Sequence, residues 1–399
     1  MTSSSPPQNK TSANPPLTPL EQLRLILKLL FLAPPQIALN TLRCLTLAYT
    51  RSIPLTHYAR CAFNRFALGS LTPRELQGIQ PPSASLYTRW AKSRARRALA
   101  SPTNPSGLET RAALLKPDVI PLPDGQSSLL WVGDRSRATK FVYFFHGGGY
   151  VCPLLPGHLE WCLRAYVAAA QAHEGEEVAV AVLAYTLSPP AKYPAQLVQA
   201  VAGLKWLLES GIRPGDLVIG GDSAGGNLTA QVLGHLLHRH PEAEEIVLGD
   251  KLAGAFLVSP WVSGRVEGGS YARNGGIDML SGGFIKDGVE NLVGGSVCQA
   301  EMEGGNVWCW PVDGDCEKWF TGLDEVVEMV YVTVGAQEVF LDQGVEFAEA
   351  VRRGNPGLDV KLEISKNEAH DWILLEGGAG EDGDAMVRMR NWATTAFWG

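Results

Sequence analysis

The segment Gly220-Gly221-Asp222-Ser223-Ala224-Gly225-Gly226 follows a short apolar run at 217–219 and opens a helical pattern at 224–240. In this strand–turn–helix setting, Gly-x-Ser-x-Gly is typical of a nucleophile elbow. The sharp turn raises the serine side chain above the sheet, and its small neighbours let the backbones approach closely. The helix behind it points its unpaired N–H groups at the same place. We therefore predict that Ser223 is a nucleophile; the alternative is a glycine-rich turn with an incidental serine.

Apolar runs and helical patterns alternate on both sides of this segment. Continuous apolar runs occupy 141–145, 178–184, 217–219, 252–258 and 326–334, and helical patterns occupy 159–172, 195–209, 224–240 and 343–353. Uninterrupted apolar runs are typical of strands buried on both faces of a parallel sheet. Their alternation with helices predicts an α/β fold, with a mostly parallel central sheet flanked by helices.

Residues 263–322 break this rhythm. They are rich in glycine, show weak periodicity and contain Trp308, Trp310 and Trp319. We expect an insertion that lies over the functional edge of the sheet as a cap. The domain reading is a disordered tail at 1–19, an N-terminal helical segment with its linker at 20–107, and the α/β domain at 108–399.

A second glycine-rich motif, His146-Gly147-Gly148-Gly149-Tyr150, comes directly after the run at 141–145. Three glycines leave backbone N–H groups free of side-chain obstruction, which an oxyanion hole requires because it stabilises charge that develops only in the transition state. Together with the amide of Ala224, this loop predicts a cradle of three donors. A glycine triplet alone would be weak evidence, but its place upstream of a nucleophile elbow makes it strong.

Three segments resemble the hormone-sensitive lipase family of α/β hydrolases, from about residue 119 to the C-terminus. Two are the motifs at 146–150 and 221–226. The third, at 185–195, is similar to the family's Y-R-L-x-P…F-P-A segment, with Thr186 where arginine is usual. The resemblance implies the α/β-hydrolase fold and carboxylesterase or lipase chemistry without a metal or cofactor. It also implies that Gly148, Gly149 and Ala224 supply the oxyanion-hole N–H groups.

His370 is the predicted base. A catalytic triad on this fold runs in the chain order serine, acid, histidine, and His370 follows a strand-like stretch at 360–364 near the C-terminus. His146 belongs to the glycine loop, and three other histidines precede Ser223. The cluster of His235, His238 and His240 could ligate a metal. Histidines at a helix C-terminus also interact favourably with the helix dipole, and we expect this structural role and not metal binding.

The triad acid is less clear. The family usually carries D-x-L-x-D after the penultimate strand, and here Glu338 stands at the catalytic position. A glutamate can still orient the imidazole and stabilise the imidazolium. Asp342, four residues on, is the rival, although it is better placed to cap the next helix. We favour Glu338.

The N-terminal segment is basic and partly apolar. Residues 1–120 carry 15 lysines and arginines against four acidic residues, whereas the rest carries 19 against 37. Two amphipathic helices separated at Pro34-Pro35 are expected between residues 20 and 49. A membrane span is not expected, because their longest uncharged stretch of 14 residues is short of the roughly 20 needed to cross a bilayer. The two helices would instead pack on the body as a lid or lie on a membrane surface. A basic run at 89–97 would suit either a solvated face or anionic headgroups.

The overall composition sets further limits. A net charge of −7 argues against nucleic-acid binding, and seven cysteines without a CxxC pair favour a reducing compartment. No signal-peptide pattern is expected in the polar, proline-rich start. We therefore expect an intracellular protein, cytoplasmic or peripherally bound to a membrane.

Together these features predict a serine carboxylester hydrolase. Its substrate would be an ester, acetyl or short acyl, of a lipophilic small molecule, similar to those of the steryl acetyl hydrolase-like members of the family. Three alternatives stay open: an amidase, lactonase or tailoring hydrolase on the same triad, a small-molecule-binding relative without catalysis, and a membrane-docked interaction protein. The oligomeric state is not predicted.

Overall fold

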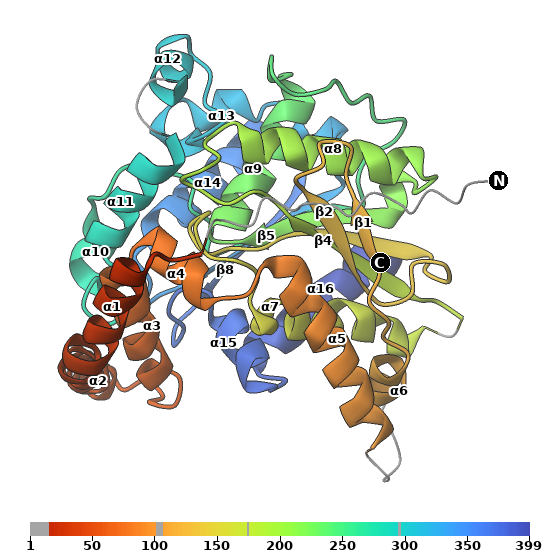
Figure 1. Ribbon diagram of the computed structural model, residues 1–399. Coiled ribbons are helices and arrows are strands. Elements are labelled where there is room, and N and C mark those ends of the chain that lie inside the picture. Colours follow the sequence, from red (N-terminus) through yellow and green to blue (C-terminus); the bar gives the residue numbers. More distant parts are fainter. Residues whose placement is uncertain (1–15, 101–106, 174, 294–296) are drawn as a thin grey trace.

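A central eight-stranded sheet organises the chain in the computed structural model, which describes residues 16–100, 107–173, 175–293 and 297–399 (Figure 1). Its strand order is β1-β2-β4-β3-β5-β6-β7-β8. The strands are β1 (Val119–Pro121), β2 (Ser128–Val132), β3 (Lys140–Phe145), β4 (Val178–Ala184), β5 (Leu217–Asp222), β6 (Gly254–Val258), β7 (Met329–Gly335) and β8 (Asp359–Ser365). Pairing is parallel from β4 to β8, and β1 and β2 join antiparallel at one edge. The predicted mostly parallel sheet is confirmed.

Helices cover both faces of the sheet. Figure 1 shows one layer containing α8 (Ala195–Glu209), α9 (Ala224–Leu237) and α14 (Leu341–Gly354). The opposite layer contains α7 (Pro156–Trp161), α15 (Trp372–Ala379) and α16 (Asp384–Trp398). The patterns at 178–184 and 195–209 coincide with β4 and α8. Residues 162–172, expected as plain helix, form a π turn (Cys162–Tyr166) and a 3-10 segment (Val167–Ala172).

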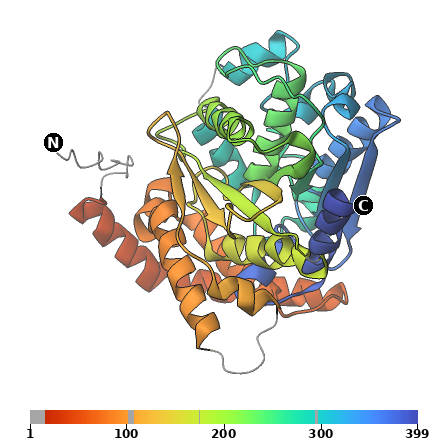
Figure 2. The same cartoon turned by 90° about the vertical axis from the view of Figure 1, so that its right-hand side faces the viewer.

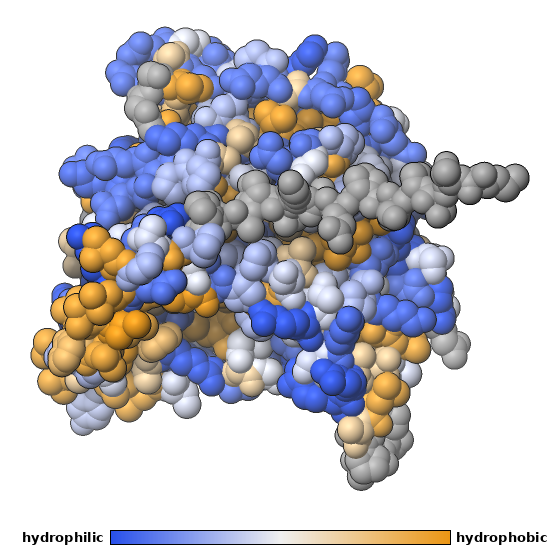
Figure 3. Space-filling model, in the orientation of Figure 1, coloured by the Kyte–Doolittle hydropathy of each residue, from blue (hydrophilic) through white to orange (hydrophobic). Residues whose placement is uncertain are grey.

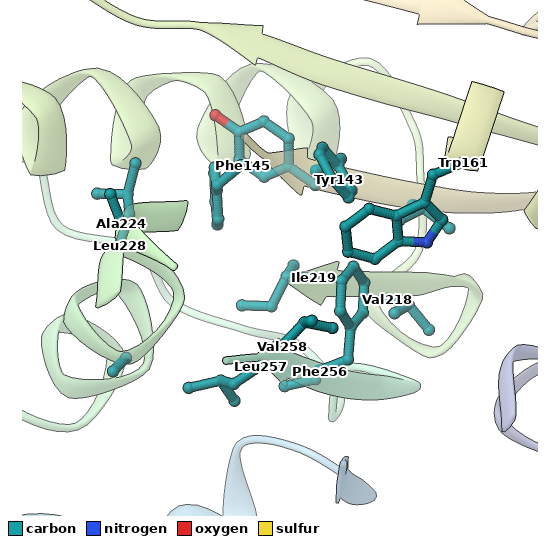
Figure 4. Packing of buried hydrophobic residues seen from close by; sticks show 14 of the residues in the cluster. Tyr143, Phe145, Trp161, Val218, Ile219, Ala224, Leu228, Phe256, Leu257 and Val258 are labelled. Carbon is teal, nitrogen blue, oxygen red and sulfur yellow. The ribbon is translucent and has the colours of Figure 1, made fainter. Parts of the chain in front are cut away.

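The core lies where the central strands meet these layers. Phe256 on β6 and Phe144 on β3 are fully buried, with ring centroids 6.1 Å apart, and Trp161 packs 4.9 Å from Phe144. Figure 4 shows Trp161 and Phe256 lying beside Val218 and Ile219 of β5. The central strands are thus buried on both faces, which explains their uninterrupted apolar sequences and makes β5 a rigid support for the turn that follows it.

The N-terminal segment forms α1 (Pro19–Leu27), a π turn (Lys28–Leu32), α2 (Ala33–Thr50), α3 (Tyr58–Ser70), α4 (Pro73–Ile79), α5 (Ser83–Leu99) and α6 (Gly107–Ala113). The expected break at Pro34-Pro35 is wrong, because both prolines lie inside α2 and the helix runs on from Pro19 to Thr50. The Ala33 N–H bonds to Lys28 O, five residues back, in the wide turn just before the prolines. A π turn relaxes the helix where proline rings crowd the preceding turn and remove donors.

Between β6 and β7 lie α10 (Gly269–Asn274), α11 (Gly282–Val293), α12 (Val297–Glu303), α13 (Cys316–Trp319) and the 3-10 turns Pro311–Asp313 and Leu323–Glu325. Trp308 and Trp319 are buried, and they contact His240 and His238 just beyond the end of α9. They therefore lie at the opposite end of α9 from Ser223, which precedes its first residue. The domain limits predicted above stay predictions, and the predicted tail and linker lie mostly at 1–15 and 101–106, outside the described residues.

Candidate active site

Ser223 occupies a strained turn between β5 and α9. Its φ of 52° and ψ of −114° lie in a region that a residue with a side chain rarely adopts. A Cβ on Gly221 or Gly225 would stand 2.0 or 1.9 Å from the carbonyl oxygen of Phe145, so only glycine lets this turn sit against the end of β3. The Ser223 N–H donates to Val258 O at 2.8 Å. The geometry is that of a nucleophile elbow.

Ser223, His370 and Glu338 form one hydrogen-bonded chain. Nε2 of His370 lies 2.9 Å from Ser223 Oγ, and Nδ1 lies 3.0 Å from Glu338 Oε2. The other oxygen of Glu338 accepts the Gly335 N–H at 3.0 Å, which fixes the carboxylate. All three are nearly covered, with exposed fractions of 5% for Ser223, 2% for His370 and 0% for Glu338. The residues predicted from the sequence are thus brought together; their catalytic roles stay a prediction.

Asp342, the rival acid, is directed elsewhere. It lies in the first turn of α14, and its carboxylate accepts the Ser270 N–H at 2.7 Å and an N–H of Arg273 at 2.8 Å. Its side chain is 46% exposed. It therefore joins α14 to α10.

Asp222 connects the glycine loop after β3 to the nucleophile elbow. Asp222 is fully buried; its Oδ1 accepts the Gly147 N–H at 3.0 Å, and its Oδ2 lies 3.2 Å from His158 Nε2. Gly148 and Gly149 have φ of 103° and 61°, which favour glycine. Ala224 begins α9, where amides have no intrahelical acceptor. These are the positions that the resemblance assigns to the oxyanion hole.

The surroundings of the glycine loop favour an ionised Asp222 and a neutral His146. Burial opposes ionisation of Asp222, but His158, His146 and the Gly147 N–H outweigh it and hold the pKa of Asp222 below its usual value. Burial lowers the pKa of His146 to about 4, so this histidine is neutral near pH 7. The His146 ring stacks on Tyr185 with centroids 4.4 Å apart, and the Tyr185 hydroxyl donates to His146 O.

Two buried aspartates near His370 were not found from the sequence. Asp371 Oδ2 lies 3.1 Å from Nε2 of His370, on the serine side of the ring. Its Oδ1 is buried and has no hydrogen-bond partner among the residues that the structure describes. Asp278 accepts the backbone N–H of His370 and of Val339. Asp371 could have been suspected from its place beside His370, whereas Asp278 lies 92 residues from the histidine and gives no local signal.

Burial dominates the pKa values of these acids. It raises the pKa of Asp371 to about 7 and that of Asp278 to about 6. Burial alone would lower the pKa of His370, but the carboxylates of Asp371 and Glu338 outweigh it and hold that pKa well above its usual value. A protonated imidazole cannot accept the serine proton, so these carboxylates move the pH at which the proposed base becomes available to higher values.

Helices from the N-terminal segment and the insertion cover the glycine loop. Leu25 of α1, Leu71 and Leu76 pack on Val151 and Cys152, which follow the loop. Phe284 of α11 also packs there. Beside this cover, between α1, α4 and the loop at 184–190, is a hollow of about 570 Å³ lined mainly by apolar atoms. Tyr185 forms part of its wall.

The histidine cluster at the C-terminal end of α9 bonds to neighbouring protein groups. His235 bonds Glu244 O, His238 bonds Trp319 O and His240 lies 3.0 Å from Glu301 Oε1. Among the residues that the structure describes, no group of three or more histidine, cysteine, aspartate or glutamate side chains could hold a metal ion.

A serine, a histidine and a carboxylate in one hydrogen-bonded chain above the carboxyl ends of parallel strands form the arrangement of serine hydrolases. Residues 142–374 match the α/β hydrolase fold family, and the chain belongs to that family. This confirms the fold predicted from the sequence.

Related proteins agree with this assignment. An acetyl-hydrolase of Streptomyces hygroscopicus is 27% identical over 264 residues, which are 63% of this chain and 76% of that protein. An esterase of Acinetobacter venetianus is 25% identical over 229 residues, 57% of this chain and 66% of that esterase. The solved structure of an esterase from the bacterial hormone-sensitive lipase family is 22% identical, with a TM-score of 0.56, and covers 80% of this chain and 99% of that one. The predicted enzyme class, a carboxylic ester hydrolase, is confirmed.

Proposed function

We propose that the chain hydrolyses a short-acyl ester, acetyl first among the candidates, of a lipophilic small molecule. The chain of hydrogen bonds from Ser223 through His370 to Glu338 carries this proposal. The similarity to an acetyl-hydrolase supports the acyl part. The apolar hollow supports a lipophilic alcohol part, since Tyr185 in its wall stacks on His146 of the glycine loop. Amides and lactones suit the same chemistry and are outcomes of the test.

The proposed mechanism follows from the positions of the atoms. With its proton on Nδ1, His370 donates to Glu338 and its Nε2 accepts the proton of Ser223 as Oγ attacks the ester carbonyl. The oxyanion is stabilised by the N–H groups of Gly148, Gly149 and Ala224. The imidazolium then protonates the leaving alcohol, and water repeats the sequence on the acyl-enzyme to release the acid and free the serine.

Turnover of p-nitrophenyl esters from acetate to long acyl chains, by wild type and Ser223→Ala, tests this function. Loss of the serine should lower kcat by several orders of magnitude, as loss of the triad serine does in subtilisin. Preference for acetate over long chains supports the acyl part. Near-wild-type turnover by Ser223→Ala would overturn the proposal. Labelling of Ser223 by a fluorophosphonate without turnover of any ester would point to an amidase or another selective hydrolase, and no labelling to a binding protein.

We also propose that the helix Pro19–Thr50 docks on a lipid bilayer surface. This helix is long and apolar enough to span a membrane, with a mean hydropathy of 1.5 over its most apolar window, and 11% of that window is buried. Figure 3 shows apolar side chains gathered over α1 and α2. Its exposed large apolar residues are Leu20, Leu23, Ile26, Leu27, Leu29, Leu30, Phe31, Leu32, Leu39, Leu42 and Tyr49.

Charge and contacts support a surface position. Besides Lys28, the helix carries Arg24 and Arg43 against one acidic residue, Glu21, and a basic surplus attracts anionic headgroups. Its other side is held to the protein, because Leu25 packs over the glycine loop and Lys28 pairs with Glu75 at 2.7 Å. A helix fixed along one side and apolar along the other suits the plane of a membrane interface. A cytoplasmic, peripherally bound enzyme is the localisation we propose.

Flotation of the full chain with anionic vesicles tests the docking. The double variant Leu30→Asp/Phe31→Asp should lose binding, whereas Val247→Asp, at an 83% exposed position between α9 and β6, should keep it. Equal flotation of the double variant and wild type would overturn the proposal. A dimer in solution that the double variant dissolves, without vesicle binding by wild type, would also overturn it and assign the apolar face to a second copy.

A further inference from the structure

We infer that Asp278 is a positioning residue for the hydrolysis, because its buried carboxylate joins the loop that carries Glu338 to the loop that carries His370. Oδ2 accepts the Val339 N–H at 2.8 Å, and Oδ1 accepts the His370 N–H at 3.3 Å. The side chain is 0% exposed. This inference rests on the proposed function, since it assigns a role in that same triad.

The two loops also meet directly, because the Gln337 N–H donates to Glu368 O and the Gln337 side chain donates to Lys366 O, both at 3.0 Å. Asp278 adds a link one residue from the acid and at the histidine itself. Val339 directly follows Glu338 in the chain, and His370 is held through its own backbone, so one carboxylate fixes both partners of the Nδ1–Oε2 hydrogen bond. Asn274, four residues before Asp278, donates from its side chain to Ala336 O at 3.0 Å and Glu338 O at 2.8 Å. The turn at 274–278 therefore holds the acid loop at two places. Displacements near 1 Å can lower rates about 100-fold.

The N-terminal helices hold this turn in place. Arg65 of α3 donates to Asp278 O at 2.7 Å, to Leu280 O at 2.9 Å and to Gly275 O at 2.6 Å. Arg51, which follows α2, donates to Asn274 Oδ1 at 3.0 Å. Contacts thus run from the N-terminal segment through the insertion to the triad. The segment that covers the glycine loop on one side of the site also fixes the acid and histidine on the other.

Asp278 also acts on charge. Its buried carboxylate lies near the imidazole of His370, and when it is ionised its negative charge stabilises the imidazolium. The titratable groups that face it are His370 and Glu338 of the triad, Cys44, Tyr58, Cys61 and Arg65 from α2 and α3, and Tyr271 from α10. Loss of its charge should therefore lower the pKa of His370, which a purely structural residue would not do.

The test compares Asp278→Asn with Asp216→Asn in the full chain, on p-nitrophenyl acetate. Asp216 binds Lys140 and Arg213 at the start of β5, the end of the strand opposite Ser223, and serves as the control. An asparagine presents one oxygen and one NH₂, so it can accept one of the two N–H groups and opposes the other. We expect kcat to fall about 10- to 100-fold with little change in KM. The acid limb of kcat/KM should move to lower pH, and Asp216→Asn should change neither.

The outcomes separate this inference from the proposed function. Persistent turnover in Ser223→Ala would remove the function itself. With that function intact, a wild-type kcat and acid limb in Asp278→Asn would overturn the inference, as would a fall in kcat that Asp216→Asn shares. If Asp278→Asn does not fold, Arg65→Gln replaces it, because this change loosens the turn and leaves the carboxylate in place. A several-fold fall in the rate of fluorophosphonate labelling of Ser223 then supports the inference, and an unchanged rate overturns it.

Discussion

His370 meets a carboxylate at each ring nitrogen. Glu338 lies 3.0 Å from Nδ1, and Asp371 lies 3.1 Å from Nε2, the nitrogen that must accept the proton of Ser223. An anion at Nε2 favours a protonated nitrogen there, so it opposes the free lone pair that a base requires. Burial raises the pKa of Asp371, so this side chain takes up a proton at higher pH than an exposed aspartate does. Asp371 is thus placed to set the pH at which the proposed base becomes available.

Asp371→Asn should therefore extend activity to lower pH. Without the anion, His370 loses a group that holds its pKa high, and the neutral imidazole persists further into acid. The acid limb of kcat/KM for p-nitrophenyl acetate should move to lower pH by about one unit or more. The loss of an interaction of about 1.36 kcal/mol is enough to shift a pKa by one unit. The profile is compared with that of Asp342→Asn, whose exposed carboxylate faces α10. An acid limb that stays in place or moves to higher pH would contradict this role for Asp371.

Glu338→Gln separates the two acids that the sequence left open. A neutral amide cannot stabilise the imidazolium and favours the wrong tautomer. The equivalent aspartate-to-asparagine change in serine proteases of the chymotrypsin type lowers kcat about 10⁴-fold. We expect a loss of about 10³- to 10⁴-fold here, and less than about threefold for Asp342→Asn. A large loss in the Asp342 variant, with Glu338→Gln active, would reverse the assignment.

At the scale of elements, one buried pair joins β5, the glycine loop and α7. Asp222 ends β5, accepts the Gly147 N–H and lies against His158, whose Nδ1 accepts the Leu155 N–H at 3.1 Å. A Cβ on Gly147 would stand 2.2 Å from Asp222 Oδ2, so glycine is required for this approach. The height of the glycine loop above the sheet is set by a side chain of the elbow itself.

Asp222→Ala should therefore lower both stability and turnover. Removal of one partner of a buried pair costs about 3–5 kcal/mol, and the loop that supplies two of the proposed oxyanion donors loses its support. Urea unfolding measures the first effect and kcat the second. Glu317→Gln is the control, because Glu317 and Arg353 pair at 2.7 Å with side chains 48% and 58% exposed, and such pairs contribute about 0–1 kcal/mol. Equal losses of stability and kcat in the two variants would contradict the role of Asp222 as the support of the glycine loop.

Features that depend on residues close together in the chain could be predicted from the sequence, and features that depend on contacts between distant residues could not. The apolar runs located β3 to β7, and the strand-like stretch at 360–364 located β8. The motifs around Ser223 and Gly148 are local, so their placement needed no tertiary information. The two antiparallel strands at one end of the sheet, β1 and β2, were missed, because their three and five residues carry too little pattern. The unbroken helix through Pro34-Pro35 was missed because a π turn leaves no sequence signal. Asp278 reaches the site only through tertiary contacts.

At the scale of the whole molecule, the same helix takes part in both the exposed apolar face and the hollow. Ile26 of α1 is 50% exposed and lines the hollow, whose other walls include Ile79 of α4 and Tyr185. Figure 2, turned from the first view, shows the N-terminal helices along one side of the α/β body. A lipophilic molecule dissolved in a bilayer under this helix would meet the hollow without crossing much water.

Docking should therefore change which esters are turned over and leave the chemistry as it is. An ester of a bulky lipophilic alcohol carried in anionic vesicles should be hydrolysed faster than the same ester dispersed in detergent, since docking raises its local concentration at the hollow. Leu30→Asp/Phe31→Asp should lose this gain and keep wild-type turnover of water-soluble p-nitrophenyl acetate, whereas Val247→Asp should keep both. Salt should reduce the gain, because headgroup attraction is screened within about 10 Å at 0.1 M. If the double variant lost p-nitrophenyl acetate turnover to the same extent, the helix would serve as part of the cover over the glycine loop and not as a membrane contact.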